Sequence, residues 1–343
     1  MGSSNTKPLR ISTTVESLNL AGKRYVVTGG SSGSGFETVA FLAQHGAEVI
    51  TSGRNIERGE RLLKERLNKD IRSSVTMYFL DLTSMGSVEA FCSKVKERWD
   101  HVDGLVNNAG GAYLGSDPTR IVKYGDKSFD ANIVGNHIGP FHLTNMLLPL
   151  LGKGGRIVNV SSFMHDNYDG SGSKSKQSDI DFQDIHFRSK PYSFGEAYGQ
   201  SKLANVLHSK ELAVRYSGRG IYSYSLHPGF MDSRFGRSFP SCVAACLKPI
   251  LCCLKCTGSV MAPLSWKDGA QTSLHCLLAE EPLQHNGSYY SQLAMIGYSD
   301  GPKMGWPLRS PNPRSHSKEL ATKLWKFSED LVEELKALEG REK

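Results

Sequence analysis

A tyrosine and a lysine spaced four residues apart are the pair in this chain best suited to acid–base chemistry. Tyr198 and Lys202 lie in Ala-Tyr-Gly-Gln-Ser-Lys, and this spacing places both side chains on one face of a helix. A free tyrosine has a pKa of about 10, and a nearby ammonium would favour the phenolate and lower that pKa towards the working range. Tyr-x-x-x-Lys is frequent by chance, and taken alone it indicates a packing tyrosine and a solvated lysine at least as well.

A glycine-rich segment far upstream could hold the cofactor that such chemistry needs. Residues 23–28 read as a short buried strand, and residues 36–43 have the apolar spacing of a helix. Glycines between them would let the backbone approach a pyrophosphate, which the free N–H groups at the helix start would face. The spacing Gly-x-x-x-Gly-x-Gly differs from the standard fingerprint, so the loop alone is also compatible with an ordinary turn. The loop residues predicted to bind a dinucleotide are Gly29, Ser31, Ser32, Gly33, Ser34 and Gly35.

The ends of the next two expected strands indicate which dinucleotide is bound. A carboxylate that binds the ribose is expected after the second strand of an NAD site, but here residues 48–52 are followed by Gly53, Arg54 and Asn55. A guanidinium can pair with a 2′-phosphate, so we expect NADP(H) rather than NAD(H), the alternative being a solvated surface arginine. The third strand, residues 75–80, ends in Asp81-Leu82, and Asp81 could accept a hydrogen bond from the adenine amino group.

Two further motifs resemble those of the short-chain dehydrogenase/reductase family, and the resemblance covers the chain from about Leu20 to Leu335. Asn107-Asn108-Ala109-Gly110 resembles the motif that steadies the sheet and lines the adenosine side. His227-Pro228-Gly229 resembles the turn beside the nicotinamide, and Ser233 stands where the family usually has a threonine. The resemblance therefore implies further cofactor contacts at Asn108, Ala109, Gly110, Leu82, Tyr198, Lys202, Pro228, Gly229 and Ser233.

The resemblance also implies a catalytic tetrad. Residues 157–162 resemble the family's strand-five motif, whose second serine is catalytic, so Ser162 is expected rather than Ser161. Asn132 and Asn136 are both available as the fourth member, and the surrounding residues fit the retinol dehydrogenase-like branch at Asn136. Ser162 would then hydrogen-bond the substrate oxygen, and Asn136 would hold a water that links Lys202 to solvent. The expected catalytic residues are Tyr198, Lys202, Ser162 and Asn136.

The 343 residues suit one α/β domain built on a Rossmann-type, doubly wound parallel sheet, over residues 20–335. We expect flexible tails at residues 1–19 and 336–343. The segments 115–127 and 166–178 look like added or mobile loops, and the second separates Ser162 from Tyr198. The family resemblance further implies that residues 236–262 form a mobile lid over the substrate.

Five of the seven cysteines fall between Cys242 and Cys256, within this expected lid. Cys253-x-x-Cys256 has no second pair nearby, so zinc is disfavoured and no metal is expected. The fold resembles an intracellular enzyme and no signal peptide is seen, which disfavours disulfides. The apolar segment could instead be acylated, and Met1-Gly2-Ser3-Ser4-Asn5-Thr6 fits the N-myristoylation pattern.

Two membrane signals of this kind could attach the protein peripherally to a membrane, and the net charge of +7 mildly favours anionic surfaces. The alternative is a disordered N-terminal tail beside an apolar lid. The sequence has no stretch of about 18 apolar residues, so no membrane-spanning helix is expected. The basic residues are spread along the chain without a recognised motif, which disfavours nucleic-acid binding. We therefore expect an intracellular protein, cytoplasmic or peripherally attached to a membrane.

Together these residues predict an NADP(H)-dependent oxidoreductase that transfers hydride between the nicotinamide and an apolar carbonyl or alcohol, such as a retinoid, a steroid or a lipid aldehyde. A homodimer is common in the family that the chain resembles. A different function, an NADP(H)-sensing scaffold with little turnover, is the alternative. The presence of all four expected catalytic residues argues against it, because a sensor does not need them.

Overall fold

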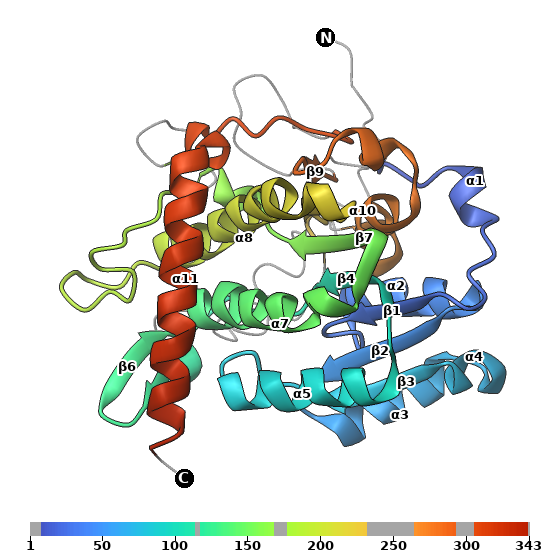
Figure 1. Cartoon of the computed structure of the whole chain (residues 1–343), viewed down its shortest axis with the longest axis horizontal. Helices are drawn as coiled ribbons and strands as arrows, with labels where there is room; N and C mark the ends of the chain where they lie inside the picture. Colours follow the sequence, from blue (N-terminus) through green and yellow to red (C-terminus); the bar gives the residue numbers. More distant parts are fainter. Residues whose placement is uncertain (1–7, 114–116, 168–176, 232–263, 293–304, 342–343) are drawn as a thin grey trace, which may run out of the picture.

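A seven-stranded parallel sheet forms the centre of the protein in the computed structural model, which describes residues 8–113, 117–167, 177–231, 264–292 and 305–341. The strand order is β3-β2-β1-β4-β7-β8-β9, and every neighbouring pair is parallel (Figure 1). This confirms the predicted doubly wound α/β fold. The strands are β1 (Arg24–Val27), β2 (Glu48–Gly53), β3 (Val75–Phe79), β4 (Val102–Asn107), β7 (Leu151–Val160), β8 (Tyr222–His227) and β9 (Tyr289–Ser291).

Helices cover both faces of the sheet and bury an apolar core on each. On one face, α5, α7, α8 and α11 contribute apolar side chains to a common core, among them Phe91, Phe141, Leu207 and Trp325. On the other, α2, α3 and α10 do the same. The helices are α1 (Thr13–Glu16), α2 (Gly33–Gln44), α3 (Ile56–Arg66), α4 (Lys69–Ser73), α5 (Met85–Arg98), α6 (Ala131–Ile133), α7 (Gly139–Leu147), α8 (Phe194–Tyr216), α10 (Trp266–Leu278) and α11 (Lys318–Glu339).

The strand order reverses at β1 and β4, and this reversal locates the site. The chain proceeds from β1 outward through β2 to β3, and then returns to β4 on the other side of β1. The connections that leave these two central strands therefore diverge, and a crevice opens at the carboxyl edge of the sheet, where ligands bind in folds of this class. The predicted glycine loop follows β1, and Asn108 follows β4, so both lie at this edge.

Helix α2 begins earlier than the apolar spacing predicts. We expected it from residue 36, but it starts at Gly33, after Ser32 as the N-cap residue. The first turn therefore takes in Ser34 and Gly35, which are both buried. A helical turn made of small polar residues and glycine shows no apolar periodicity, so the sequence pattern does not predict it. Close packing at this helix end nevertheless requires such small residues.

The two terminal segments are ordered over more of their length than expected. Ile11 and Val15 are buried, and the side chain of Gln292 exchanges two hydrogen bonds of 2.7 Å with the backbone of Leu9. At the other end, α11 continues to Glu339, whose carboxylate accepts a bond of 2.7 Å from the Gly86 amide. Residues 8–19 and 336–341, which were expected as parts of flexible tails, are therefore in contact with distant partners.

A short antiparallel hairpin begins within the loop expected at residues 115–127 and extends to Asp130. Its strands are β5 (Ile121–Tyr124) and β6 (Lys127–Asp130). Tyr124 and Phe129 are buried and pack edge to face at 5.7 Å. Lys127 forms an ion pair of 2.7 Å with Glu334 of α11, so the hairpin is fastened to that helix.

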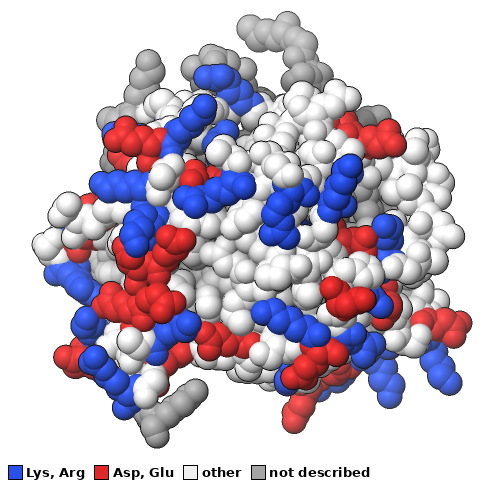
Figure 2. All heavy atoms as spheres, viewed as in Figure 1, with Lys and Arg blue, Asp and Glu red and all other residues white. Residues whose placement is uncertain are grey.

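Acidic and basic side chains are interspersed over the face of the molecule seen in Figure 2.

Several predicted features lie outside the described residues. These are Ser233, Gly2 with the rest of residues 1–7, most of the 166–178 loop, and the 236–262 lid with its cysteines. Residues on either side of the lid segment are close together, because Met231 and Leu264 form an isolated parallel bridge. Among the helices that the structure describes, none is long and apolar enough to cross a membrane.

Two buried histidines on the α5–α8 face predict a loss of stability in acid. His137 and His208 are buried with their rings 5.7 Å apart. Burial lowers the pKa of His137 to about 3, and burial followed by the charge of His137 lowers the pKa of His208 well below its usual value. An unfolded histidine titrates at about 6.5, so below that pH the unfolded chain takes up protons that the folded chain does not.

The free energy of unfolding should therefore be greatest above about pH 6.5 and should fall as the pH drops towards about 3, the pKa of His137. Urea titrations at pH 7 and pH 5 would measure this change. His208→Phe should make it smaller, whereas His101→Gln, at a side chain that is 50% exposed, should leave it unchanged. An equal pH dependence in wild type and His208→Phe would contradict the expectation.

Candidate active site

The glycine loop lies tightly against the segment that follows β4. Gly29 has a φ of +71°, and a Cβ there would lie 3.0 Å from Ala109 Cβ. A Cβ on Gly35 would lie 2.3 Å from Asn108 Nδ2 and 2.7 Å from the Gly29 oxygen. The side chain of Ser32, the N-cap residue, makes no cap hydrogen bond, so the N–H groups at the start of α2 are not capped by it. This is the arrangement in which a helix start can receive a phosphate.

Gly30 was missing from the predicted site. A Cβ at this position would lie 2.2 Å from Thr51 Oγ1, and the Gly30 amide donates to that same oxygen at 3.0 Å. Gly30 thus lets the loop pack onto β2. The signal was present in the sequence, since Gly30 directly follows Gly29, but the spacing rule placed weight only on the other glycines.

Asn108 ties the cofactor loop to both central strands. Its Nδ2 donates to the Thr28 oxygen at 2.8 Å, and its Oδ1 accepts a bond of 3.1 Å from Ser34 Oγ. Thr28 Oγ1 in turn accepts the amides of Asn108 and Ala109, at 3.0 and 2.9 Å. Thr28 was not singled out from the sequence, although it immediately precedes the glycines. The predicted residues Gly29, Ser34, Gly35, Asn108 and Ala109 are therefore brought together.

The residues expected to determine whether NADP(H) or NAD(H) binds follow β2 and β3. Arg54 is exposed at the end of β2, and it forms no ion pair with any residue in the described ranges. Ser31 lies beside the same strand end, where a Cβ on Gly53 would be 3.9 Å from its Oγ. Asp81 Oδ1 accepts the Thr83 amide at 2.9 Å and the Thr83 hydroxyl at 2.7 Å, so one oxygen of this carboxylate already has two donors.

Leu82 and the turn after β8 complete the rim of the crevice. Leu82 is buried against the first residue of α7, where a Cβ on Gly139 would lie 2.1 Å from the Leu82 oxygen. Pro228 is buried, and Gly229 has a φ of +86°. A Cβ on Gly229 would lie 2.4 Å from Leu264 Cδ1 and 3.3 Å from Gln292 Cγ. This turn is therefore closely packed and needs glycine at that position.

Tyr198, Ser162 and Lys202 meet at the carboxyl end of β7. Tyr198 and Lys202 are buried on α8, and Lys202 Nζ is 5.4 Å from the centre of the Tyr198 ring. The Ser162 side chain hydrogen-bonds Tyr198, whereas Ser161 Oγ donates to the Lys202 backbone oxygen at 2.7 Å. Of the two serines, it is Ser162 that contacts the tyrosine, and Ser161 fixes the strand end to α8.

Burial controls the titration of both ionisable groups. It raises the pKa of Tyr198, and the hydrogen bond from Ser162 opposes this rise. It also lowers the pKa of Lys202 to about 8, while Lys202 Nζ donates to the Val160 oxygen at 3.2 Å. The expected lowering of the Tyr198 pKa by Lys202 is therefore not seen in the protein by itself, because removal of the phenol from water raises this pKa and only the hydrogen bond with Ser162 opposes the rise.

Asn136 is held by backbone and side-chain bonds close to Lys202. It lies in a π-helical turn, Val134–Ile138, between α6 and α7; such turns are frequent at functional sites. Its Oδ1 accepts the Gly111 amide at 2.8 Å, and its Nδ2 donates to the Gly111 oxygen and to Ser201 Oγ. Asn132 instead bonds Tyr113 and Tyr192. Asn136 is therefore the asparagine that borders the Tyr198–Lys202 helix segment.

Gly110 offers a direct test of this geometry. A Cβ at this position would lie 2.9 Å from Asn136 Oδ1 and 3.3 Å from Lys202 Nζ, so Gly110→Ala must displace one of these side chains. Because a shift of about 1 Å in an active site can cost about 100-fold, we expect turnover to fall at least about tenfold. Gly152→Ala is the control, since a Cβ there meets nothing within 4 Å. Similar kcat values for the two variants would contradict the expectation.

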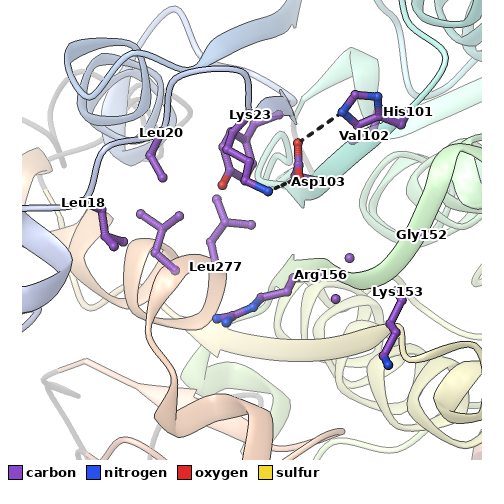
Figure 3. A pocket seen from close by; sticks show the side chains of 14 residues that line it. Leu18, Leu20, Lys23, His101, Val102, Asp103, Gly152, Lys153, Arg156 and Leu277 are labelled. Atoms are coloured by element: carbon purple, nitrogen blue, oxygen red, sulfur yellow. Dashed lines mark hydrogen bonds and ion pairs between the residues drawn. The ribbon is translucent and has the colours of Figure 1, made fainter.

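A cavity of about 330 Å³ lies at the opposite edge of the sheet (Figure 3). It opens where β1, β4 and β7 begin, and so it is remote from the residues described above. Three of its charged groups have partners in the protein: Lys23 pairs with Asp103 at 2.9 Å, and Arg156 donates to the carbonyls of Cys276 and Ala279. Within the described part of the chain, no group of His, Cys, Asp and Glu has the arrangement of a metal site.

Comparisons with known proteins show the family to which this chain belongs. The family model described as short chain dehydrogenase matches residues 23–172. Retinol dehydrogenase 12 of Bos taurus is 34% identical over 320 residues, which cover 92% of this chain and 88% of that protein. Retinol dehydrogenase 13 of Homo sapiens is 32% identical over 322 residues, covering 91% and 85%.

Solved structures share the same architecture. An uncharacterised protein of Mycobacterium paratuberculosis is 27% identical, with a TM-score of 0.64 over 92% of this chain and 95% of that one. A short chain dehydrogenase of Burkholderia cenocepacia, solved in complex with NADP, has a TM-score of 0.57 at 24% identity, covering 82% and 100%; this likeness shows the fold. The chain therefore belongs to the short-chain dehydrogenase/reductase family, in its retinol dehydrogenase-like branch.

Proposed function

We propose that this protein is an NADP(H)-dependent oxidoreductase that interconverts a carbonyl and an alcohol on an apolar substrate, with Tyr198 as the acid and base. The observation that carries this proposal is the buried contact between Tyr198 and Ser162, with Lys202 on the next helical turn, at the sheet edge that bears the glycine loop. Membership of the family supports hydride-transfer chemistry and the use of a nicotinamide cofactor.

Each catalytic side chain has a distinct task in this proposal. A bound nicotinamide would supply or accept the hydride. The Tyr198 hydroxyl donates its proton to the oxygen of the substrate in reduction, and takes it back in oxidation. Ser162 stabilises the charge that develops on that oxygen. Lys202, when protonated, favours the phenolate of Tyr198, and Asn136 holds a water that connects Lys202 to solvent.

The residues at the predicted dinucleotide site fit the cofactor. Gly35 lets the start of α2 pack closely against Asn108, which a Cβ would approach to 2.3 Å, and the N–H groups at that helix start carry no side-chain cap that would compete with a pyrophosphate. Arg54 follows β2, exposed and without an ion-pair partner among the described residues, and so a 2′-phosphate would provide its counter-charge. The NADP complex of the Burkholderia cenocepacia structure agrees with this preference.

Arg54→Gln should weaken NADPH binding without affecting NADH binding. A hydrogen bond to a charged group contributes about 1.5–3 kcal/mol, so we expect the Kd for NADPH to rise about 10- to 100-fold. Titration calorimetry with both cofactors would measure this. Arg61→Gln, at an exposed arginine on α3, is the control. An unchanged NADPH to NADH preference in Arg54→Gln would assign the selectivity to other residues.

The apolar substrate is proposed from the names of the relatives, which are retinol dehydrogenases. The test is NADPH and NADH consumption by the purified protein against retinal, other apolar aldehydes and steroid ketones. NADPH-linked turnover of at least one such carbonyl would support the proposal. Tight NADPH binding without turnover of any carbonyl would favour the sensing scaffold instead.

Attachment to a membrane surface and dimerisation are further parts of the proposal. The Gly2 pattern and the cysteines 242–256 support lipid attachment. Labelling of cells with an alkynyl myristate, with Gly2→Ala as the unlabelled control, would test the first site. Sedimentation of the purified protein would test for a homodimer.

A further inference from the structure

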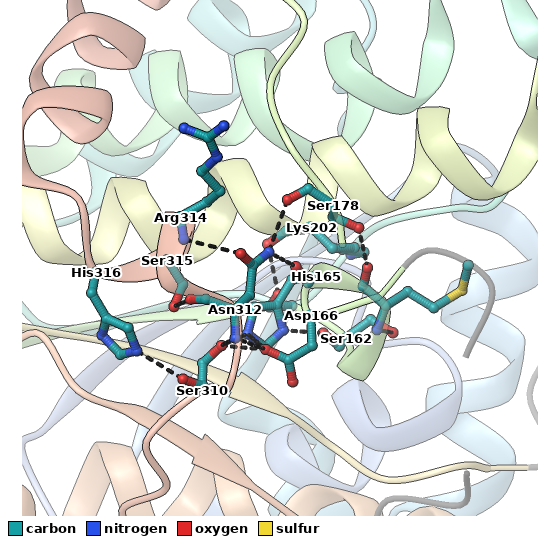
Figure 4. Close-up of polar contacts among 12 residues, drawn as sticks. Ser162, His165, Asp166, Ser178, Lys202, Ser310, Asn312, Arg314, Ser315 and His316 are labelled. Atoms are coloured by element: carbon teal, nitrogen blue, oxygen red, sulfur yellow. Dashed lines mark hydrogen bonds and ion pairs between the residues drawn. The ribbon is translucent and has the colours of Figure 1, made fainter. Parts of the chain in front are cut away.

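The turn that carries Ser162 is enclosed by a segment far along the chain. Ser162 begins a short 3₁₀ turn, Phe163–His165, and its Oγ accepts the Met164 amide at 3.2 Å. A polar segment that runs from Ser310 to His316, just before α11, packs directly against this turn (Figure 4). From these contacts we infer that Ser310 and Asn312 are positioning residues, which hold Ser162 in its reactive orientation. The inference rests on the proposed function.

The ring of His165 transmits the contact from Ser310 to Ser162. This ring is completely buried, and its Nδ1 lies 2.5 Å from the Ser162 backbone oxygen. A carbonyl oxygen can only accept, so Nδ1 is the donor. On its other side, Nε2 is 3.0 Å from Ser310 Oγ and 3.0 Å from Asp166 Oδ1. Ser310 also donates to Asp166. The imidazole is therefore fixed at both ends, between the Ser162 carbonyl and Ser310.

Asn312 hydrogen-bonds both ends, at His165 and Ser178, of the insertion that separates Ser162 from Tyr198. Its Nδ2 donates to the His165 oxygen and to the Ser178 oxygen, each at 2.8 Å. The two ends of the insertion are also joined by the isolated β-bridge between Asn167 and Gln177. One completely buried amide group thus spans the start and the end of the insertion, so the insertion leaves the active site with both ends fixed.

The local sequence makes this segment stiff. Pro311 and Pro313 flank Asn312, and proline fixes its own φ and restricts the residue before it. The Asn312 amide nitrogen lies 3.2 Å from Ser310 Oγ and 3.4 Å from Asp166 Oδ1. A stiff support is useful here because catalytic groups lose efficiency steeply with small displacements, and Ser162 must present its hydroxyl to both Tyr198 and the substrate.

The experiment compares Ser310→Ala and Asn312→Asp with a matched control in the full-length protein. Ser328→Ala is that control, because Ser328 is also a buried serine bonded to a buried histidine, with its Oγ 2.8 Å from His137 Nε2. Asn312→Asp keeps the shape of the side chain but loses both N–H donors. We expect kcat to fall about 10- to 100-fold in the two test variants, with the Kd for NADPH unchanged and with Ser328→Ala like wild type.

A double-mutant cycle distinguishes positioning from general damage. If Ser310 acts through Ser162, then Ser310→Ala should lower kcat in the wild-type background but have no further effect in Ser162→Ala. Equal losses in both backgrounds, or a wild-type kcat in Ser310→Ala and Asn312→Asp, would overturn the inference.

Hydrogen exchange provides a readout that does not need turnover. The amides of Met164 and His165 both donate to Ser162, the first to its Oγ and the second to its backbone oxygen. They should exchange faster in Ser310→Ala and Asn312→Asp than in Ser328→Ala. Unchanged exchange would overturn the inference by itself. Absence of turnover in the wild type would contradict the proposed function, and exchange would then decide the structural inference.

Discussion

Replacing Tyr198 with phenylalanine should lower kcat for NADPH-linked carbonyl reduction by about 10²- to 10⁴-fold, which is the usual contribution of a positioned general acid. The variant removes one hydroxyl and keeps the ring, which stacks on Phe194 at 5.8 Å and lies 5.4 Å from Lys202 Nζ. The fold and the cofactor site should therefore survive. Steady-state kinetics together with NADPH titration would measure both quantities.

Tyr224→Phe is the matched control for this experiment. Tyr224 is also a buried tyrosine whose pKa burial raises, but its hydroxyl donates to the Pro282 oxygen at 2.8 Å, away from the site. It should retain the wild-type kcat. If Tyr198→Phe kept most of its turnover, another group would have to move the proton, and the role proposed for Tyr198 would be wrong.

Lys202→Met should have the second largest effect, a loss of about 100-fold or more in kcat. The change keeps an unbranched side chain in a buried position but removes the charge that we propose favours the phenolate of Tyr198. Because burial lowers the pKa of Lys202 to about 8, the lysine is charged below that pH and neutral above it. The wild-type rate of reduction should thus fall as the pH rises through about 8, and this fall should be missing from the profile of Lys202→Met.

Lys210→Met controls for the loss of a lysine from the same helix. Lys210 lies on α8, burial lowers its pKa too, and its Nζ is 3.5 Å from the Gly287 oxygen. Its pH profile should match that of the wild type. A step near pH 8 that persists in Lys202→Met would assign the titration to another group.

Local sequence predicted the residues whose partners are a few positions away. Tyr198 and Lys202 share a helical face by spacing alone, and the glycine loop follows from a strand and a helix on either side of it. The preference for Ser162 came from the family resemblance, and the structure places this serine, not Ser161, against Tyr198. Gly30 was overlooked because a spacing rule says nothing about packing onto β2.

Long-range contacts account for what the sequence did not reveal. Ile11 seemed part of a loose tail because its environment is made by residues more than two hundred positions away, such as Gln271, whose side chain accepts the Ile11 amide. The pKa of Tyr198 was expected to fall, since burial cannot be read from a motif. Ser310 and Asn312 carry no motif at all, and their contact with the Ser162 turn depends on the complete fold.

The contact of Asn312 with the Ser162 turn also has a consequence for the order in which the protein matures. A chain is made from its N-terminus, and its earlier parts can begin to fold during synthesis. The glycine loop, β1 and β4 all lie before residue 110, so the part of the dinucleotide site that they form can assemble while the chain is still growing, whereas the contacts expected from Tyr198, Lys202, Pro228 and Gly229 come later. The support of Ser162 arrives only with Ser310 and Asn312. The glycine-loop half of the site would therefore form first, and catalysis would begin only when synthesis is almost finished.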